Sequence, residues 1–174
     1  MKKIIAIIPA RYASTRFPGK PLALVNGIPM IIRVMRQAAK VFSDVCIATD
    51  DERIYDKAVE MGGKAVMTSA SHRSGTDRCL EALTKYQKES GKIFDVVLNV
   101  QGDEPYIKPE QLKTLANCFN DSSVDIATLV KRCKSLAEVN DPNRPKVVVD
   151  KFWNALCFSR SVIPFFRGGE LNDE

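Results

Sequence analysis

The sequence has very little histidine and no closely paired cysteines. His72 is the only histidine in the 174 residues, which excludes a metal site built from several histidines. The five cysteines are scattered along the chain, and none forms a CxxC pair or another spacing typical of a metal site. We interpret them as reduced residues of the core, as expected in a cytoplasmic protein.

Long apolar runs are also absent. The longest uninterrupted run falls far short of the roughly 18 residues that a membrane span needs. The apolar stretch after Lys2 and Lys3 ends at Pro9, so it is too short for the core of a signal peptide. We therefore expect no membrane partner. A chain of 174 residues fits one ordinary domain, and we predict a single domain over residues 1–174.

Acidic residues are missing from the start of the chain. The first forty residues contain eight Lys and Arg and no Asp or Glu, whereas the rest contains 18 basic and 21 acidic residues. The net charge of +5 therefore originates in the first segment, where a positive field can concentrate anions. Apart from Tyr12 and Phe17, no aromatic residues lie among these cations, and no nucleic-acid-binding motif is present, so we expect no nucleic-acid partner.

Strand-like and helix-like segments alternate along the chain. Short apolar runs predict strands at 4–8, 44–49, 64–68, 94–100 and 125–131, with a hairpin over 146–149 and 155–158. Helical spacing of apolar residues predicts helices at 29–42, 51–61, 76–87 and 109–119, with a helical turn at 135–139. This alternation predicts an α/β fold of three layers around a mostly parallel central sheet.

The first strand leads into a loop that contains three cations. The run Ile4–Ile8 is followed by Arg11, Ser14, Arg16 and Lys20, in a segment whose glycine and prolines exclude a helix. The loop matches neither the Walker A pattern nor GxGxxG. Because ligands bind outside the carboxyl ends of strands in open α/β sheets, it is a candidate cradle for a polyanion. The alternative is an ordinary solvated basic loop.

A pair of acidic residues follows the strand at 94–100. Asp103 and Glu104 lie in the segment VQGDEP, in a turn that contains Gly102 and Pro105. A carboxylate at this end of a strand is well placed to hold Mg²⁺ against a phosphate that is bound at a neighbouring strand end. The alternative is an acidic turn that precedes the helix at 109–119.

Two further segments combine cations with small or polar residues. In SHRSGTDR, Ser74 and Gly75 allow close approach of the backbone, Arg73 and Arg78 add positive charge, and Thr76 is the expected helix N-cap. In FSRSVIP, Arg160 follows an apolar strand and could clamp a carboxylate, although a surface role is equally compatible with the residues.

Together these motifs resemble one family. Their order and spacing from Ile4 to about Pro164 are similar to those of the 3-deoxy-manno-octulosonate (KDO) cytidylyltransferases, also called CMP-KDO synthetases. The motifs that carry the resemblance are PARYASTRFPGKPL, TDD, SHRSGTDR, NVQGDEP and FSRSVIP. The resemblance implies a Rossmann-like nucleotidyltransferase fold and the transfer of CMP from CTP to KDO. The products would be pyrophosphate and CMP-KDO, the activated sugar of lipopolysaccharide biosynthesis.

The resemblance also implies roles for individual residues. Those implied to hold the triphosphate are Arg11, Ser14, Arg16 and Lys20. Those implied to recognise cytosine and ribose are Ala10 (through its backbone), Arg73, Ser74 and Gly75. Those implied to act in the reaction are Lys20, Arg16 and Asp103, of which Asp103 binds Mg²⁺. Gln101 is implied to contact the nucleotide or the sugar, and Arg160 to bind the KDO carboxylate.

Members of this family continue well beyond the position that matches Glu174. We therefore expect this chain to be truncated relative to the family and its fold to be incomplete at the C-terminus. The further part is implied to carry a late Asp that binds a second Mg²⁺, much of the KDO pocket, and the contact of a homodimer. The alternatives are another sugar nucleotidyltransferase, such as a sialic acid cytidylyltransferase, or a non-catalytic fragment that only binds nucleotide.

Overall fold

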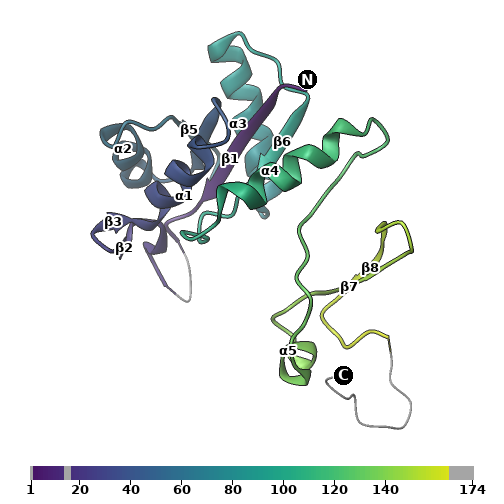
Figure 1. Cartoon of the computed structure of the whole chain (residues 1–174). Coiled ribbons are helices and arrows are strands. Elements are labelled where there is room, and N and C mark those ends of the chain that lie inside the picture. Colours follow the sequence, from purple (N-terminus) through teal and green to yellow (C-terminus); the bar gives the residue numbers. More distant parts are fainter. Residues whose placement is uncertain (1, 14–16, 165–174) are drawn as a thin grey trace. The chain divides into compact units, whose positions relative to one another are not determined.

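The chain consists of two compact units. The computed structural model describes residues 2–13 and 17–164 (Figure 1). Unit 1 comprises Met1–Ala127 and unit 2 comprises Thr128–Glu174. The single domain expected over residues 1–174 stays a prediction.

Unit 1 is built on a parallel sheet of four strands in the order β5-β4-β1-β6. The strands are β1 (Ile4–Ala10), β4 (Val45–Thr49), β5 (Ala65–Met67) and β6 (Val96–Asn99). All three pairings are parallel. β4 is buried throughout and β1 is almost entirely buried, as expected for apolar runs covered on both faces. The predicted α/β fold with a parallel central sheet is therefore confirmed.

Helices cover both faces of this sheet (Figure 1). Side chains alternate along β1, so that Ala6 and Ile8 enter one core cluster while Ile5 and Ile7 enter the other. The helices that contribute to the first cluster are α1 (Met30–Ala39), α2 (Glu52–Glu60) and α4 (Pro109–Asn117); α3 (Gly75–Ser90) contributes to the second. The three layers follow from this alternation, because each face of the strand needs an apolar partner.

The start of α3 differs from the prediction. Ser74, and not Thr76, is the N-cap, because Ser74 has an extended backbone and its hydroxyl accepts a hydrogen bond of 3.1 Å from the Asp77 N–H. Gly75 is thus the first residue of the helix, and Thr76 lies within its first turn. Ser74 and Thr76 are both good N-cap residues and lie two positions apart, so the sequence defined the start of the helix only approximately.

β1 continues through Pro9, where the sequence suggested a break. Pro9 pairs with Ala48, whereas the pairing between β1 and β6 extends only from Ile4 to Ile7. The Val100 N–H donates to the Ile7 carbonyl, so Pro9, two residues further along β1, faces the same side. Because the register with β6 has ended there, the missing N–H of proline removes no ladder hydrogen bond.

The strand predicted at 125–131 is wrong. The structure has no strand there and pairs the segment with none of the described strands; the side chain of Ile126 is 90% exposed. An apolar run forms a strand only where a neighbouring strand supplies hydrogen bonds and packing, so its composition alone was insufficient.

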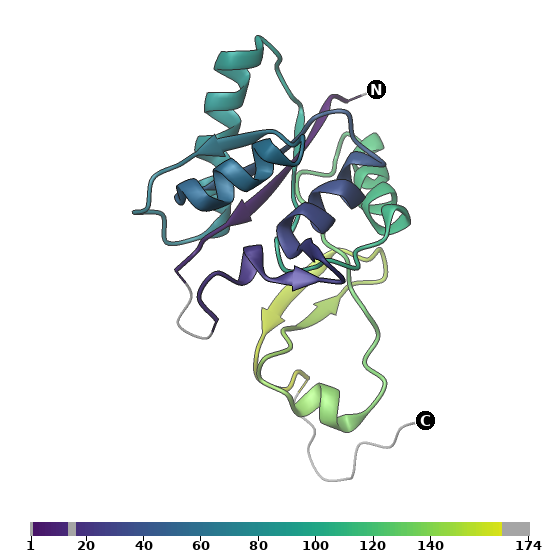
Figure 2. The same cartoon turned by 90° about the vertical axis from the view of Figure 1, so that its left-hand side faces the viewer.

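A small antiparallel pair, β2 (Leu24–Val25) and β3 (Ile28–Pro29), was not predicted. Asn26 and Gly27 connect its strands with φ values of 48° and 76°. An Asn-Gly pair with positive φ at both residues is typical of a tight hairpin, so the signal was present in the sequence. Figure 2 shows this pair beside α1, next to the short 3₁₀ helix η1 (Lys20–Leu22).

Unit 2 contains a short helix and a hairpin. α5 (Leu136–Asn140) is capped by Ser135, and β7 (Lys146–Val149) pairs antiparallel with β8 (Ala155–Ser159). The predicted helical turn and the predicted hairpin are both confirmed.

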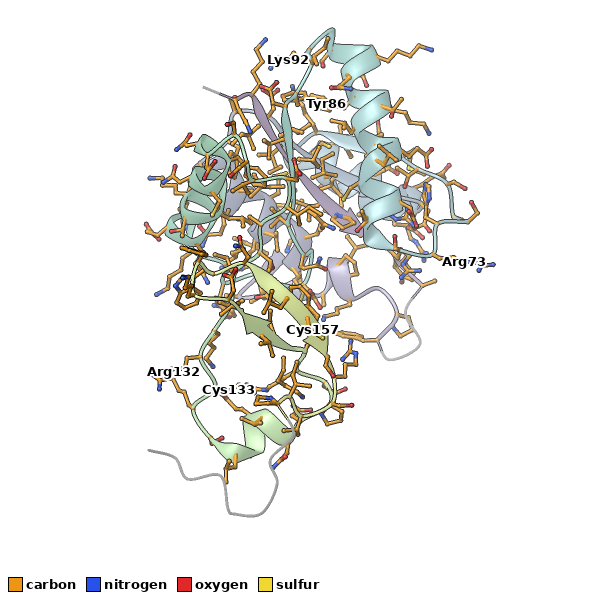
Figure 3. All side chains as sticks on the ribbon, turned by 90° about the vertical axis from the view of Figure 1, so that its right-hand side faces the viewer. Arg73, Tyr86, Lys92, Arg132, Cys133 and Cys157 are labelled. Atoms are coloured by element: carbon orange, nitrogen blue, oxygen red, sulfur yellow. The ribbon has the colours of Figure 1, made fainter. Side chains whose placement is uncertain are left out.

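The cysteines were only partly predicted. Cys46 and Cys79 lie in the core, where burial raises the pKa of each thiol to about 12. The other three, Cys118, Cys133 and Cys157, are exposed, so the expectation that they belong to the core is wrong (Figure 3). None of the helices within residues 2–13 and 17–164 combines the length and the hydrophobicity that a membrane span requires.

Candidate active site

The strand order defines one place where loops from both sides of the sheet meet. From β1 the chain proceeds to β4 and β5 on one side, and α3 then carries it back to β6 on the other side. The switch point therefore lies between the carboxyl ends of β1 and β6, which is where doubly wound sheets bind ligands. Ala10 ends β1 as a buried residue, and Gln101 follows β6 as an exposed one.

The predicted residues Lys20 and Asp103 meet at this switch point. The Lys20 Nζ lies 2.7 Å from the Asp103 Oδ2, although the two residues are 83 positions apart in the chain. Their side chains are 38% and 52% exposed, so both remain accessible to a ligand. Such an exposed ion pair adds only about 0–1 kcal/mol to stability, and exchanging it for contacts with a ligand is therefore not costly.

Two glycines allow the surrounding loops to approach β1 closely. A Cβ on Gly102 would lie 3.0 Å from both the Pro9 carbonyl oxygen and the Ile31 Cδ1. A Cβ on Gly75 would lie 3.4 Å from the Pro9 Cγ. A side chain at position 102 would thus displace the loop that carries Asp103. The loops after β5 and β6 both converge on the end of β1.

The loop after β1 is tied together at its ends. The Gly19 N–H donates a hydrogen bond of 2.9 Å to the Tyr12 carbonyl, and Gly19 has a φ of +71°. Arg11 is exposed directly after β1. The predicted triphosphate ligands Ser14 and Arg16 lie outside the described residues.

Three of the predicted cytosine and ribose ligands lie at the start of α3 and directly before it. Arg73 is exposed and extends away from the neighbouring elements of unit 1 (Figure 3). The Ser74 hydroxyl donates to the Asp77 carboxylate over 2.7 Å in addition to capping α3. Gly75 is the member of this group that lies against the end of β1.

His72 belongs to a polar cluster beside this segment. Its Nε2 is paired with Glu81, which also forms an ion pair of 2.7 Å with Lys85 and accepts the Ser69 N–H at 2.9 Å. These contacts, led by the hydrogen bond from Lys85, lower the pKa of Glu81 to about 2. Glu81 thus anchors the segment between β5 and α3 as an ionised carboxylate.

Arg78 is buried and does not add positive charge to the loop surface, as the sequence had suggested. It is 1% exposed, and its guanidinium donates to the Asp50 carboxylate at 2.9 Å and to the Thr68 hydroxyl at 2.5 Å. This ion pair joins α3 to the ends of β4 and β5. Removing either partner would leave an uncompensated buried charge.

The two predicted sugar ligands have different surroundings. The Gln101 Nε2 lies 3.5 Å from the Asn99 Oδ1 beside β6. Arg160 belongs to unit 2, where its Nη1 donates to the Pro142 carbonyl at 3.0 Å. The role of Arg160 toward a substrate carboxylate stays a prediction.

The carboxylates at the site are compatible with Mg²⁺ that is shared with a phosphate. Within the described part of the chain, no group of three or more His, Cys, Asp or Glu side chains could form a metal cage. Mg²⁺ is commonly held by one or two carboxylates together with substrate phosphates. Asp103, half-exposed at a strand end and beside a lysine, fits this kind of site.

Sequence reasoning missed a second contact on the loop after β1. The Arg53 Cζ lies 3.3 Å from the centroid of the Tyr12 ring, and the Arg53 Nη2 lies 2.6 Å from the Asp51 Oδ2. The sequence signal that could have indicated these contacts was the segment Thr49–Asp51, which places two carboxylates directly after β4.

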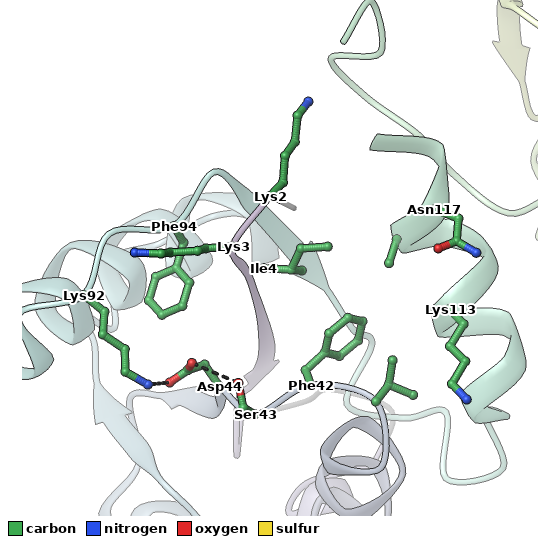
Figure 4. Close-up of a pocket in the computed structure, with 12 residues that line it drawn as sticks. Lys2, Lys3, Ile4, Phe42, Ser43, Asp44, Lys92, Phe94, Lys113 and Asn117 are labelled. Atoms are coloured by element: carbon green, nitrogen blue, oxygen red, sulfur yellow. Dashed lines mark hydrogen bonds and ion pairs between the residues drawn. The ribbon is translucent and has the colours of Figure 1, made fainter. Parts of the chain in front are cut away.

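A pocket of about 650 Å³ lies at the opposite edge of the sheet, around the start of β1 (Figure 4). Four lysines line it: Lys2, Lys3, Lys92 and Lys113. Asp44 in this pocket is bonded to the Lys92 Nζ at 2.6 Å and to the Tyr86 hydroxyl at 2.9 Å. The pocket is distant from the carboxyl ends of the strands and is not the candidate site.

The doubly wound parallel sheet, with a lysine and a carboxylate paired at its switch point, is compatible with an α/β nucleotidyltransferase, and the comparisons with known proteins show this class. A sequence profile described as cytidylyltransferase matches residues 5–172. A solved structure of CMP:2-keto-3-deoxy-manno-octonic acid synthetase complexed with CTP is 42% identical, with a TM-score of 0.85 over 95% of this chain and 67% of that one.

Curated relatives narrow the class further. The 3-deoxy-manno-octulosonate cytidylyltransferase of Parabacteroides distasonis is 56% identical over 99% of this chain and 69% of its own length. That of Bacteroides thetaiotaomicron is 53% identical over 98% of this chain and 68% of its own length. The chain belongs to the 3-deoxy-manno-octulosonate cytidylyltransferases, a family of nucleotidyltransferase enzymes, and spans about two thirds of the length of these relatives.

Proposed function

We propose that this protein transfers CMP from CTP to KDO and releases pyrophosphate. The observation that carries the proposal is the contact of 2.7 Å between Lys20 and Asp103 at the switch point of the sheet. It brings together a cation for phosphate and a carboxylate for Mg²⁺. A sialic acid cytidylyltransferase is the less favoured alternative, because the curated relatives reported above carry the KDO name.

In this proposal the protein contributes mainly positioning and charge neutralisation. A KDO hydroxyl attacks the α-phosphorus of CTP in line with the departing pyrophosphate. Lys20 and Arg16 stabilise the negative charge that develops on pyrophosphate, while Arg11 and Ser14 hold the triphosphate. Such a mechanism needs no histidine base, in agreement with the scarcity of histidine.

Asp103 is the residue that would hold Mg²⁺ in this proposal. When bound, Mg²⁺ would neutralise phosphate charge and lower the pKa of the attacking hydroxyl. The half-exposed Asp103 carboxylate supports this assignment, since it can exchange its contact with Lys20 for a metal.

Cytosine is recognised in this proposal by the end of β1 and by the segment before α3. Ala10 ends β1 at the switch point, where its backbone is assigned to the base, and Gly75 lies close to the same strand end. Arg73 and Ser74 complete the contacts to base and ribose. The exocyclic amine of cytosine donates where uracil accepts, so a mismatch would leave a buried polar group unpaired.

On the sugar side, Gln101 contacts the nucleotide or KDO in this proposal, and Arg160 binds the KDO carboxylate. We also propose that residues 1–174 belong to a single nucleotidyltransferase domain. We further propose a cytoplasmic enzyme whose full-length form is a homodimer. These residue roles, the cytoplasmic location and the homodimer are proposed on the basis of the family resemblance.

The test is a calorimetric titration of the chain with CTP, UTP, ATP and GTP, each with Mg²⁺. We expect CTP to bind at least about tenfold more tightly than UTP, a difference of about 1.4 kcal/mol. Circular dichroism on the same sample establishes that the chain is folded. A folded chain that binds none of the four nucleotides, or binds them equally, would contradict the proposal.

Turnover is measured separately as pyrophosphate release from CTP with KDO or with sialic acid as the acceptor. We expect release with KDO and none with sialic acid. Release with sialic acid alone would favour the alternative enzyme.

A further inference from the structure

We propose that Arg53 is a positioning residue that acts through Tyr12 to fix the loop after β1, and thereby Lys20, for the triphosphate. This inference rests on the proposed function, because it assigns a purpose to residues that lie beside the nucleotide loop. It concerns the segment after Thr49, which resembles the family but has no role in the site described above.

Arg53 is in direct contact with the ring of Tyr12. The Arg53 Cζ lies 3.3 Å from the centroid of the Tyr12 ring, so the guanidinium is stacked on the ring at van der Waals distance. Stacking of a planar guanidinium on an aromatic face is favoured by both charge and shape. Arg53 lies on α2 and Tyr12 follows β1, so this contact joins two different elements of unit 1.

The orientation of Arg53 is fixed by Asp51. Its Nε and Nη2 donate to the two oxygens of Asp51 at 2.9 and 2.6 Å, a bidentate arrangement. Asp51 is itself the N-cap of α2 and accepts the Arg53 N–H at 3.1 Å. These bonds lower the pKa of Asp51, led by the side-chain hydrogen bond from Arg53. The guanidinium is therefore aimed by the first turn of a helix.

The Tyr12 ring is connected to Lys20 through Gly19. A Cβ on Gly19 would lie 3.0 Å from the Tyr12 Cζ, so the ring packs closely against the Gly19 backbone. The Gly19 N–H also donates to the Tyr12 carbonyl, and Lys20 is the next residue. Displacement of the ring would therefore move the backbone from which the Lys20 side chain reaches Asp103.

Arg53 acts through the Tyr12 ring and not through an electrostatic effect of its own charge on the ligand. The Asp51 carboxylate already compensates the Arg53 charge. The Tyr12 hydroxyl is not needed for this effect, because the stacked ring makes the contact with Arg53. The predicted effect is consequently specific to the β- and γ-phosphates, which the loop and Lys20 hold, and spares the cytidine monophosphate portion.

The test compares CTP and CMP binding by calorimetry for the parent chain and for Arg53→Gln, Tyr12→Leu and Tyr12→Phe. We expect Arg53→Gln and Tyr12→Leu to raise the Kd for CTP about tenfold and the Kd for CMP less than about twofold. Tyr12→Phe keeps the ring and should bind CTP like the parent. The double variant of Arg53→Gln and Tyr12→Leu should be no worse than either single one, because both remove the same contact.

The matched control is Arg36→Gln, which removes an exposed arginine from α1 in the same unit. Arg53→Gln that binds CTP as well as Arg36→Gln would overturn the proposal. Equal losses for CTP and CMP, or a loss in Tyr12→Phe as large as in Tyr12→Leu, would overturn it too.

A second measurement needs no nucleotide. Limited trypsin digestion followed by mass spectrometry reports how often the segment 11–20 opens to the protease. We expect Arg53→Gln and Tyr12→Leu to be cut there several-fold faster than Arg36→Gln, with unchanged cutting at the other Lys and Arg sites of unit 1 that all three variants retain. Equal cutting of segment 11–20 in Arg53→Gln and Arg36→Gln would refute the role of Arg53 in fixing the loop. A parent chain that binds no CTP would refute the proposed function, but the digestion would still test the contact between Arg53 and Tyr12.

Discussion

The two edges of the central sheet use charged residues in opposite ways. At the carboxyl edge, Lys20 and Asp103 form a single contact and keep much of their surface exposed. At the amino edge, Asp44 is only 6% exposed and is bonded to Lys92 (Figure 4) and also to Tyr86. A half-exposed ion pair can exchange partners for a ligand, whereas a buried carboxylate with several partners belongs to the scaffold.

The pKa of Asp44 illustrates the second case. Burial by itself would raise this pKa, but the hydrogen bonds from Lys92 and Tyr86 outweigh burial, and the pKa lies below its ordinary value of 3.8. The carboxylate is therefore ionised and satisfied at neutral pH. The comparison teaches that a charged cluster next to a pocket need not be a ligand site, since here the charge is already compensated by the fold.

Asp103→Asn should have the largest effect. Asparagine keeps the shape of the side chain but loses the charge that we propose binds Mg²⁺, so we expect Mg²⁺-dependent release of pyrophosphate from CTP and KDO to fall about 10²-fold or more. The free energy of unfolding should stay within about 0.5 kcal/mol, as for other exposed sites. Glu104→Gln, at the neighbouring exposed carboxylate, is the control. Near-parent turnover in Asp103→Asn would remove this residue from the metal site.

Lys20→Ala should have the second largest effect. Because Lys20 is assigned to the β- and γ-phosphates, we expect CTP affinity measured by calorimetry to fall about 30-fold and CMP affinity about threefold or less. Lys40→Ala, which removes an exposed lysine after α1, should leave both affinities unchanged. Equal losses for CTP and CMP in Lys20→Ala would count against its role at the leaving group.

Asp44→Asn tests the amino edge of the sheet. Loss of charge-assisted hydrogen bonds to a buried carboxylate should lower the free energy of unfolding by about 2 kcal/mol, measured by urea denaturation at pH 7. CTP affinity should change less than about twofold, since the residue lies at the opposite edge from Lys20. A large loss of CTP affinity without loss of stability would break the comparison between the edges.

The same residue predicts a pH dependence. Because the folded-state pKa of Asp44 is lowered, its contribution to stability is complete above the ordinary value of 3.8 and is lost as the pH falls through the folded-state pKa. We therefore expect the stability difference between the parent and Asp44→Asn to shrink below about pH 4. A difference that persists unchanged in this range would contradict the linkage.

Ser74→Ala and Thr76→Ala should have the smallest effects. Ser74 caps α3, so its loss should lower the free energy of unfolding by about 1 kcal/mol, whereas Thr76→Ala should cost only a few tenths. Thermal unfolding of both variants distinguishes them. A larger cost for Thr76→Ala would restore the cap position suggested by the sequence.

The sequence predicted Asp103 near a phosphate bound at a neighbouring strand end for a general reason. The carboxyl ends of parallel strands meet at one edge of a sheet, so residues just after two adjacent strands are expected near each other. The same argument could not predict the state of Arg78. Its burial depends on Asp50 and Thr68, which lie at the ends of two other strands, and only the folded arrangement brings these partners together.

Other differences also depend on tertiary context. The segment 125–131 has the composition of a strand but pairs with no described strand. Pro9 is accepted inside β1 because the pairing with β6 ends before it. By contrast, the hairpin at Asn26 and Gly27 depends on local backbone preference, so it was predictable from the sequence and was overlooked.

The return of β6 to the side of β1 also sets an order of assembly. β1 pairs with β4 and β4 with β5, but Ile4 finds its partner Val96 only when the chain closes a loop of about 90 residues. During synthesis from the N-terminus, one side of β1 therefore stays unpaired until β6 leaves the ribosome. Asp103 follows β6 directly, so the carboxylate that faces Lys20 is added in the same step that completes the sheet.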